Sequence, residues 1–256
     1  MLNRLDHLVI LVRDLDQAVR EYEVLGFTVT SGGDHADGLT RNALIPFRDG
    51  SYLELVAFLD PEDPRENVWG WRVFLPSGGG LIDYCAASDD LGDDARALEE
   101  RGLGVEGPTD GGRRLPDGTE IRWRVARIRQ DGRLLPFLIE DVTPRSLRVP
   151  GGPAAEHPNG ATGISRLRLA ASDKRAATSS LATLVGAPDA RVGSFRVGTC
   201  TLSLAAGREP EVRRRLDAVG PGPLEAWLAT REGGEARGLD RRLSEGDGLW
   251  LLEGTP

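Results

Sequence analysis

Four side chains that can bind a divalent cation recur at related places in this sequence. His7 and Asp83 each lie in an apolar, β-rich stretch, and Glu54 and Glu140 each lie beside apolar residues in a later stretch. A carboxylate in such surroundings is costly to bury unless a cation or hydrogen-bond donors compensate its charge. One imidazole and three carboxylates suit Mn²⁺, Fe²⁺, Mg²⁺, Zn²⁺ or Ni²⁺. We therefore take His7, Glu54, Asp83 and Glu140 as candidate metal ligands, and Glu54 and Glu140 also as candidate catalytic groups.

A structural interpretation of the same four residues stays open, in which no metal is bound. A histidine on a strand is commonly a hydrogen-bonded structural residue, and glutamates are mostly exposed to water. Asp83 is the weakest candidate, because aspartate is shorter than histidine. The argument for a site is that the four residues recur together.

The first half of the chain reads as two copies of one pattern. The sequence shift that aligns the two apolar stretches also maps Asp14 to Asp90 and Gly26 to Gly102. The loops in the later part of the second copy are longer than those of the first copy. Allowing for this difference, we align Glu54 with Glu140. Because an internal repeat dictates the architecture, we expect the candidate ligands to face a common point across a pseudo-two-fold axis.

Each copy predicts the element order βαβββ. Asp14 with Gln17 resembles a helix capping box, and Asp49-Gly50 is a hairpin signal. In the first copy we expect a strand, a helix and three strands, at residues 5–12, 14–25, 27–31, 42–48 and 51–58. In the second copy the same elements are expected near residues 81–88, 93–101, 105, 120–129 and 135–142.

The domain organisation follows from these copies. We expect a first domain at residues 1–147 with modules at about 1–60 and 80–145, a Pro- and Gly-rich linker at 148–162, and a degenerate, partly truncated pair at 163–256. In the third copy, Arg166 and Ser203 stand at the places of the histidine and the first glutamate, so we predict no metal there.

Composition restricts the function classes. The chain has 256 residues, a formal net charge of −8 and an isoelectric point near 5.1, which argues against nucleic acid or an anionic membrane as a partner. Cys85 and Cys200 suit a reducing cytoplasm, and no signal-peptide pattern or membrane-spanning apolar run occurs. We expect a cytoplasmic protein, monomer or homodimer, that binds a small molecule.

These residues resemble the glyoxalase-like branch of the vicinal oxygen chelate superfamily, which includes glyoxalase, bleomycin-resistance and dioxygenase types. The resemblance rests on residues 5–9, 40–45, 52–55 and 136–140, and covers about residues 1–150 well. It implies an α+β fold in which paired βαβββ modules form a cupped, eight-stranded mixed sheet with a divalent metal in the concavity. Members use this metal to bind vicinal oxygens of a substrate, and others have lost the metal and sequester drugs.

Carried over residue by residue, His7, Glu54 and Glu140 match ligand positions of the family. Asp83 stands where the catalytic members have a second histidine, which is a departure from the standard set of ligands. The substrate-binding candidates lie on the central strands of the two copies and are Arg41, Asn42, Trp123 and Arg124.

Three functions compete on this basis. The first is a divalent-metal-dependent lyase, isomerase or dioxygenase-like enzyme that acts on a small oxygenated substrate. The second is a metal-free binding protein of the bleomycin-resistance type, whose ligand stacks on Trp123 and pairs with Arg41 or Arg124. The third is an interaction scaffold in which the C-terminal half forms a dimer.

Overall fold

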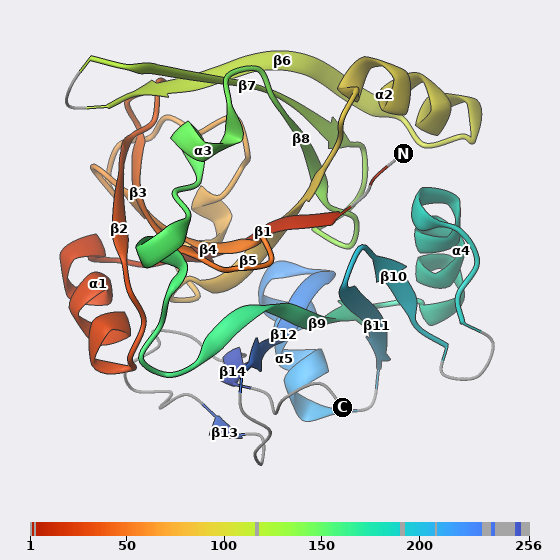
Figure 1. Ribbon diagram of the computed structural model, residues 1–256. Helices are drawn as coiled ribbons and strands as arrows, with labels where there is room; N and C mark the ends of the chain where they lie inside the picture. Colours follow the sequence, from red (N-terminus) through yellow and green to blue (C-terminus); the bar gives the residue numbers. More distant parts are fainter. Residues whose placement is uncertain are drawn as a thin grey trace.

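The computed structural model describes residues 2, 4–115, 118–189, 193–207, 209–231, 237–238 and 249–251. These residues form an eight-stranded sheet and a six-stranded sheet, with helices packed against them (Figure 1). The α+β class with paired βαβββ modules is confirmed. Within the described ranges, no helix has the length and apolar character needed to cross a membrane.

Both modules follow the predicted element order. The first module consists of β1 (Arg4–Leu11), α1 (Leu15–Val24), β2 (Thr30–Asp34), β3 (Thr40–Pro46) and β4 (Tyr52–Phe58). The second consists of β5 (Gly80–Ala87), α2 (Leu91–Glu100), β6 (Val105–Arg114), β7 (Glu120–Ile128) and β8 (Phe137–Asp141). A 3₁₀ turn, η1 (Arg72–Phe74), lies in the connection between them.

The two modules join through their first strands into one curled sheet. The strand order is β2-β3-β4-β1-β5-β8-β7-β6, with β1 antiparallel to β5 at the centre. The edge strands β2 and β6 approach each other, so the sheet curls into a half-barrel (Figure 1). Strands of both modules line the inner face of this half-barrel.

The helices begin at the predicted capping residues. Asp14 accepts a hydrogen bond from the Gln17 backbone N–H at 3.0 Å, and Asp90 accepts one from Asp93 at 2.9 Å. Each side chain satisfies one of the backbone donors that a helix start leaves unpaired. Gly26 and Gly102 both have a positive φ just after the helices, as the repeat requires.

Asp90→Ala is expected to lower the free energy of unfolding by about 1 kcal/mol, the usual effect of losing an N-cap side chain. Urea denaturation followed by circular dichroism measures this. Glu99→Ala, at an exposed position of the same helix, is the control and should change the value by less than about 0.5 kcal/mol. Equal effects of the two substitutions would contradict the capping role.

Equivalent backbone hydrogen bonds fix the register of the two copies. The Val12 N–H donates to the Val56 carbonyl at 2.8 Å, and the Ser88 N–H donates to the Ile139 carbonyl at 2.8 Å. The repeat aligns Val12 with Ser88, so Val56 is the structural equivalent of Ile139.

This register corrects the alignment of the two glutamates. The equivalent of Glu54 is Phe137, and the predicted match of Glu54 with Glu140 is wrong by three residues. Side chains alternate between the faces of a strand, so an odd shift moves a residue to the other face. Phe137 and Ile139 accordingly pack inside the half-barrel, whereas Leu138 lies in the outer core. Glu140 therefore lies on the outer face.

The chain leaves the half-barrel through two short helical turns and builds the second sheet. The turns are α3 (Arg145–Arg148) and η2 (Gly152–Ala155). The elements that follow are β9 (Ala161–Ala171), α4 (Lys174–Val185), β10 (Phe195–Val197), β11 (Cys200–Ala206), α5 (Pro210–Val219), β12 (Gly222–Thr230), β13 (Arg237–Gly238) and β14 (Leu249–Leu251). The sheet order is β10-β11-β9-β12-β14-β13, which continues the degenerate repeat.

The third copy has the same strand pairing as the first copy but does not have the candidate ligand residues. β9 pairs parallel with β11, as β1 does with β4. In this register Arg166 and Ser203 hold the places of His7 and Glu54. The absence of a metal there stays a prediction.

Both sheets share one apolar core. Leu8 and Leu53 of the half-barrel belong to the same buried cluster as Leu167 and Leu228 of the second sheet. The second sheet and the two module helices thus cover the outer face of the half-barrel. The inner face has a separate cluster, which includes Trp71 from the connection between the modules.

Candidate functional site

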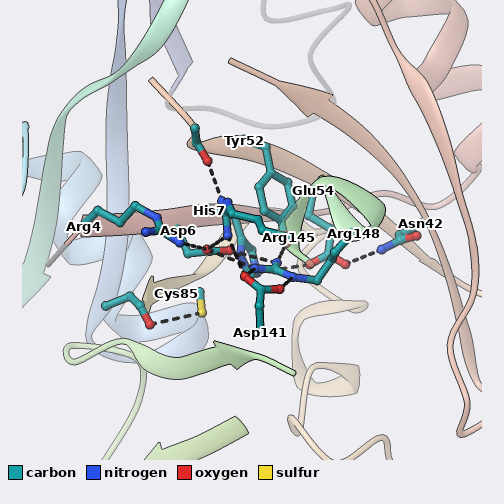
Figure 2. A network of polar contacts seen from close by, with 12 residues as sticks. Arg4, Asp6, His7, Asn42, Tyr52, Glu54, Cys85, Asp141, Arg145 and Arg148 are labelled. Atoms are coloured by element: carbon teal, nitrogen blue, oxygen red, sulfur yellow. Dashed lines mark hydrogen bonds and ion pairs between the residues drawn. The ribbon is translucent and has the colours of Figure 1, made fainter. Parts of the chain in front are cut away.

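His7 is buried on β1 inside the half-barrel. Its Nδ1 lies 2.8 Å from Asp6 Oδ1, and its Nε2 lies 3.4 Å from Glu54 Oε2 (Figure 2). Its ring stacks on Tyr52 with the centroids 4.5 Å apart. Neighbouring strand residues normally face opposite ways, but the β1–β5 pairing shifts register between Leu5 and His7. The Asp6 carboxylate can therefore orient the imidazole that follows it.

Glu54 is the centre of the cluster. Asn42 donates its Nδ2–H to Glu54 Oε1 at 2.6 Å, and His35 Nε2 lies 3.4 Å from the same oxygen. The other oxygen faces His7. Two imidazoles thus flank one buried carboxylate.

The pKa shifts fit this arrangement. Burial alone would raise the pKa of the Glu54 carboxyl, but hydrogen bonds from His35 and His7 hold it well below its usual range. Burial alone would lower the pKa of His7, but its bonds to Asp6 and Glu54 raise it. Glu54 is therefore an anion at neutral pH.

Sequence reasoning missed His35. This residue lies in the connection between β2 and β3, with Nδ1 2.7 Å from Thr40 Oγ1 and Nε2 3.2 Å from Asn42 Nδ2. A signal was present, since the chain has only three histidines. Nothing in the repeat indicated it, because its position has no counterpart in the second copy's pattern.

Asp6 belongs to a buried network of ion pairs with arginines of α3. The Arg148 guanidinium donates to Asp6 Oδ1 at 3.0 Å, to Asp141 Oδ1 at 2.6 Å and to the Tyr52 hydroxyl at 2.8 Å (Figure 2). Arg145 also donates to Asp6. Burial would raise the pKa of Asp6, but these cations, Arg148 foremost, hold it well below its usual range. The α3 segment therefore fixes the charge beside His7.

The cluster opens into a small chamber of about 50 Å³. Trp69, Trp71, Trp123 and Phe137 form its apolar walls, and Arg113 and Arg148 add positive charge. A groove of about 640 Å³ lies between β2 and the β6–β7 hairpin, and Arg113 lines both spaces. A molecule in the groove can therefore present one end to the chamber.

Two of the four predicted substrate-binding residues line this chamber. Asn42 and Trp123 do so, whereas Arg41 and Arg124 do not. Arg41 pairs with Asp16 at 3.1 Å, and Arg124 pairs with Glu140 at 2.6 Å. The arginines alternate with their neighbours along β3 and β7, and this alternation turns them away from the chamber.

Asp83 and Glu140 stay apart from the histidine–glutamate cluster. Asp83 accepts from Trp71 Nε1 at 2.9 Å and lies 3.4 Å from Arg133 Nε, and burial raises its pKa. Glu140 accepts from the Leu91 backbone N–H at 2.9 Å, at the start of α2. Neither residue lines the chamber.

A second group of ligand-type atoms lies on the far side of His7. One atom each from Asp6, His7 and Cys85 lies within 4.8 Å of the others. Asp6 is already paired with two arginines, and burial raises the pKa of the Cys85 thiol well above its usual range. A neutral thiol beside arginines is a poor cation site.

The chain matches the sequence pattern of a glyoxalase-like domain over residues 5–185. It is 30% identical over 92 residues to the uncharacterised protein YwbC of Bacillus subtilis (strain 168), a match that covers 36% of this chain and 65% of that protein. The aligned part therefore spans about two thirds of the curated relative's length.

Solved structures support the fold. A hypothetical protein from Staphylococcus aureus superposes over 100% of both chains with a TM-score of 0.75 and 15% identity. A mutant 4-hydroxymandelate synthase from Streptomyces coelicolor covers 90% of this chain and 71% of its own, with a TM-score of 0.57 and 14% identity. At these identities the likeness concerns architecture alone.

Proposed function

This chain belongs to the glyoxalase-like domain family of the vicinal oxygen chelate superfamily, and from this premise we propose a divalent-metal-dependent enzyme that acts on a small oxygenated molecule. The observation that supports it best is the meeting of two imidazoles on one buried carboxylate inside the half-barrel. We assign the metal ligands as His7 Nε2, His35 Nε2 and a Glu54 oxygen, with Asp83 and Glu140 left out.

By residue type, these three ligands suit a divalent cation. Among the described residues only Asp6, His7 and Cys85 have ligand atoms that all lie within 4.8 Å of one another, so the proposed set has to close around the cation when it binds. Two histidines and one carboxylate form a common set for Fe²⁺ and related ions, and leave positions open for substrate. Ligating histidines usually donate their other ring nitrogen to a carboxylate or similar group. Asp6 beside His7 and Thr40 beside His35 supply that support.

The cation and the residues around it would have separate roles in a reaction. When bound, a divalent cation would act as a Lewis acid on a substrate oxygen, an effect worth several kcal/mol. Asn42 holds the Glu54 carboxylate, and tryptophan side chains line the chamber beside it. The Glu54 oxygen that does not hold the cation would accept a proton from a substrate carbon or hydroxyl. Asp6 would keep the His7 imidazole oriented toward the cation.

Metal addition tests this proposal. At a free metal concentration about 100 times the Kd, the chelator-treated protein gains about 2.7 kcal/mol of stability, which raises Tm by about 5–10 °C for a chain of this size. Differential scanning calorimetry with Mn²⁺, Fe²⁺, Mg²⁺, Ni²⁺ and Zn²⁺ in turn measures the shift. Glu140→Gln should show the same shift as the wild type. If no cation raises Tm, the metal-dependent proposal fails.

A metal-free binding protein is the alternative. The aromatic walls favour it, because Trp69, Trp71 and Trp123 offer stacking surfaces for an organic ligand. In that case ligands stabilise the protein equally in the presence and absence of a chelator.

A further inference from the structure

Arg113 on β6 is a buried cation to which the described residues offer no ion-pair partner. Its side chain is only 7% exposed. It donates to the Arg148 carbonyl at 2.8 Å and to Asn42 Oδ1 at 3.4 Å, which are both neutral acceptors. Its Nε–H has no hydrogen-bond partner, and within the described part of the chain no carboxylate lies within 4.0 Å of the guanidinium.

The nearby Arg148 shows how this protein otherwise buries a guanidinium. Its side chain is 3% exposed and pairs with both Asp6 and Asp141. A buried charge without such pairing costs several kcal/mol of free energy. Burial accordingly lowers the pKa of Arg113, with the Glu54 carboxylate acting only at longer range. The fold therefore holds a positive charge in Arg113 that its own acids leave uncompensated.

The position of Arg113 suits ligand recognition. The residue lines both the chamber and the groove, and its guanidinium contacts Asn42, which also lines the chamber. Gly32 makes room for it, because a Cβ there would lie 2.9 Å from Arg113 Nη1 and 1.9 Å from Asn42 Oδ1. Arg113 is the one residue that the linings of the chamber and of the groove have in common among the described residues.

We propose that Arg113 binds a carboxylate of the substrate, so that the substrate is an oxygenated organic acid whose head enters the chamber and whose remainder lies in the groove. A guanidinium offers two parallel N–H donors to a carboxylate, which gives strength and orientation. The small volume of the chamber admits only the head of the molecule, and the larger groove admits a tail. This inference rests on the proposed function, because it concerns the same chamber.

Matched acids and amides test the inference. The probes are lactate and 3-phenyllactate, compared with lactamide and 3-phenyllactamide, which have the same shape without the charge. Calorimetry on the metal-loaded and the chelator-treated wild type should show binding of the acids at least 10-fold tighter than of the amides. The phenyl compounds should bind more tightly than the short ones if the groove holds the tail.

Substitutions on β6 test whether Arg113 is the residue that causes the preference for acids. Arg113→Gln should abolish the preference for acids over amides, and Arg113→Lys should restore part of it. Arg114→Gln, which removes a neighbouring exposed arginine paired with Glu120 at 2.5 Å, is the control and should keep the preference. If Arg113→Gln does not fold, the wild-type comparison of acids with amides still decides.

The outcomes separate this inference from the proposed function. Metal-induced stabilisation with no preference for acids overturns the role of Arg113 and leaves the metal proposal intact. A preference for acids that needs Arg113, without any response to metal, supports the inference and overturns metal dependence. An acid preference that persists in Arg113→Gln overturns the inference.

Discussion

Glu54→Gln is expected to weaken divalent-cation binding by more than about 100-fold, since loss of an outer-shell partner alone typically costs about 10- to 100-fold in affinity. The substitution keeps the shape of the side chain and its contact with Asn42. It removes the negative charge that both histidines face. Metal content of the purified protein by mass spectrometry and Kd by calorimetry measure the effect.

The repeat supplies a matched control for this experiment. Glu140→Gln changes the same residue type in the second copy, where the carboxylate pairs with Arg124 outside the chamber. Its metal content should equal that of the wild type. Equal metal content in the wild type and both variants would remove Glu54 from the site. Loss of metal in both variants would return Glu140 to the ligand set, as predicted from the sequence.

Arg148→Met is expected to destabilise the protein by about 3 kcal/mol, the lower end of the usual cost of breaking a buried ion pair, because Asp6 and Asp141 both keep Arg145. Asp6 is fully buried and Arg148 nearly so. Methionine fills much of the volume but leaves Asp6 with Arg145, the more distant Arg4 at 3.9 Å and His7 as its remaining partners. The whole stability of a domain is only about 5–15 kcal/mol, so the variant should unfold at far lower urea concentration.

A double substitution distinguishes lost pairing from lost packing. Asp6→Asn combined with Arg148→Met removes both charges, so its stability should lie closer to the wild type than that of Arg148→Met alone. A cost below about 1 kcal/mol for Arg148→Met, or strictly additive effects in the double variant, would contradict a role for this ion pair.

Local patterns in the sequence predicted the fold well. The helix starts and ends depend only on nearby residues. They are marked in both copies by a capping aspartate, Asp14 or Asp90, and by a glycine after the helix, Gly26 or Gly102. The register of β8 was harder to predict. Its loop lengths differ from those of the first copy, and an error of three residues places Glu140 on the wrong face of its strand.

The sequence predicted only those residues of the candidate site whose direction follows from the alternation of side chains along a strand. His7, Glu54, Asn42 and Trp123 were named from the sequence, and the structure brings them to one chamber. His35 lies in the connection between β2 and β3, beside the strand of Glu54, where strand alternation gives no rule. Arg113 lies on the edge strand β6, and the curl of the sheet brings it to Asn42 on β3. Asp6 was missed because ideal alternation places it opposite His7, and the register shift in β1 cancels that rule.

The segment that joins the two modules has a further consequence for how relatives can diverge. It contributes Trp69 and Trp71 to the chamber, and Trp71 also binds Asp83, the residue at the place of His7 in the second copy. The connection between the two modules thus forms part of the chamber wall, and a change in its length would alter that wall. Descendants can acquire new specificity by altering this loop while both halves of the scaffold stay unchanged.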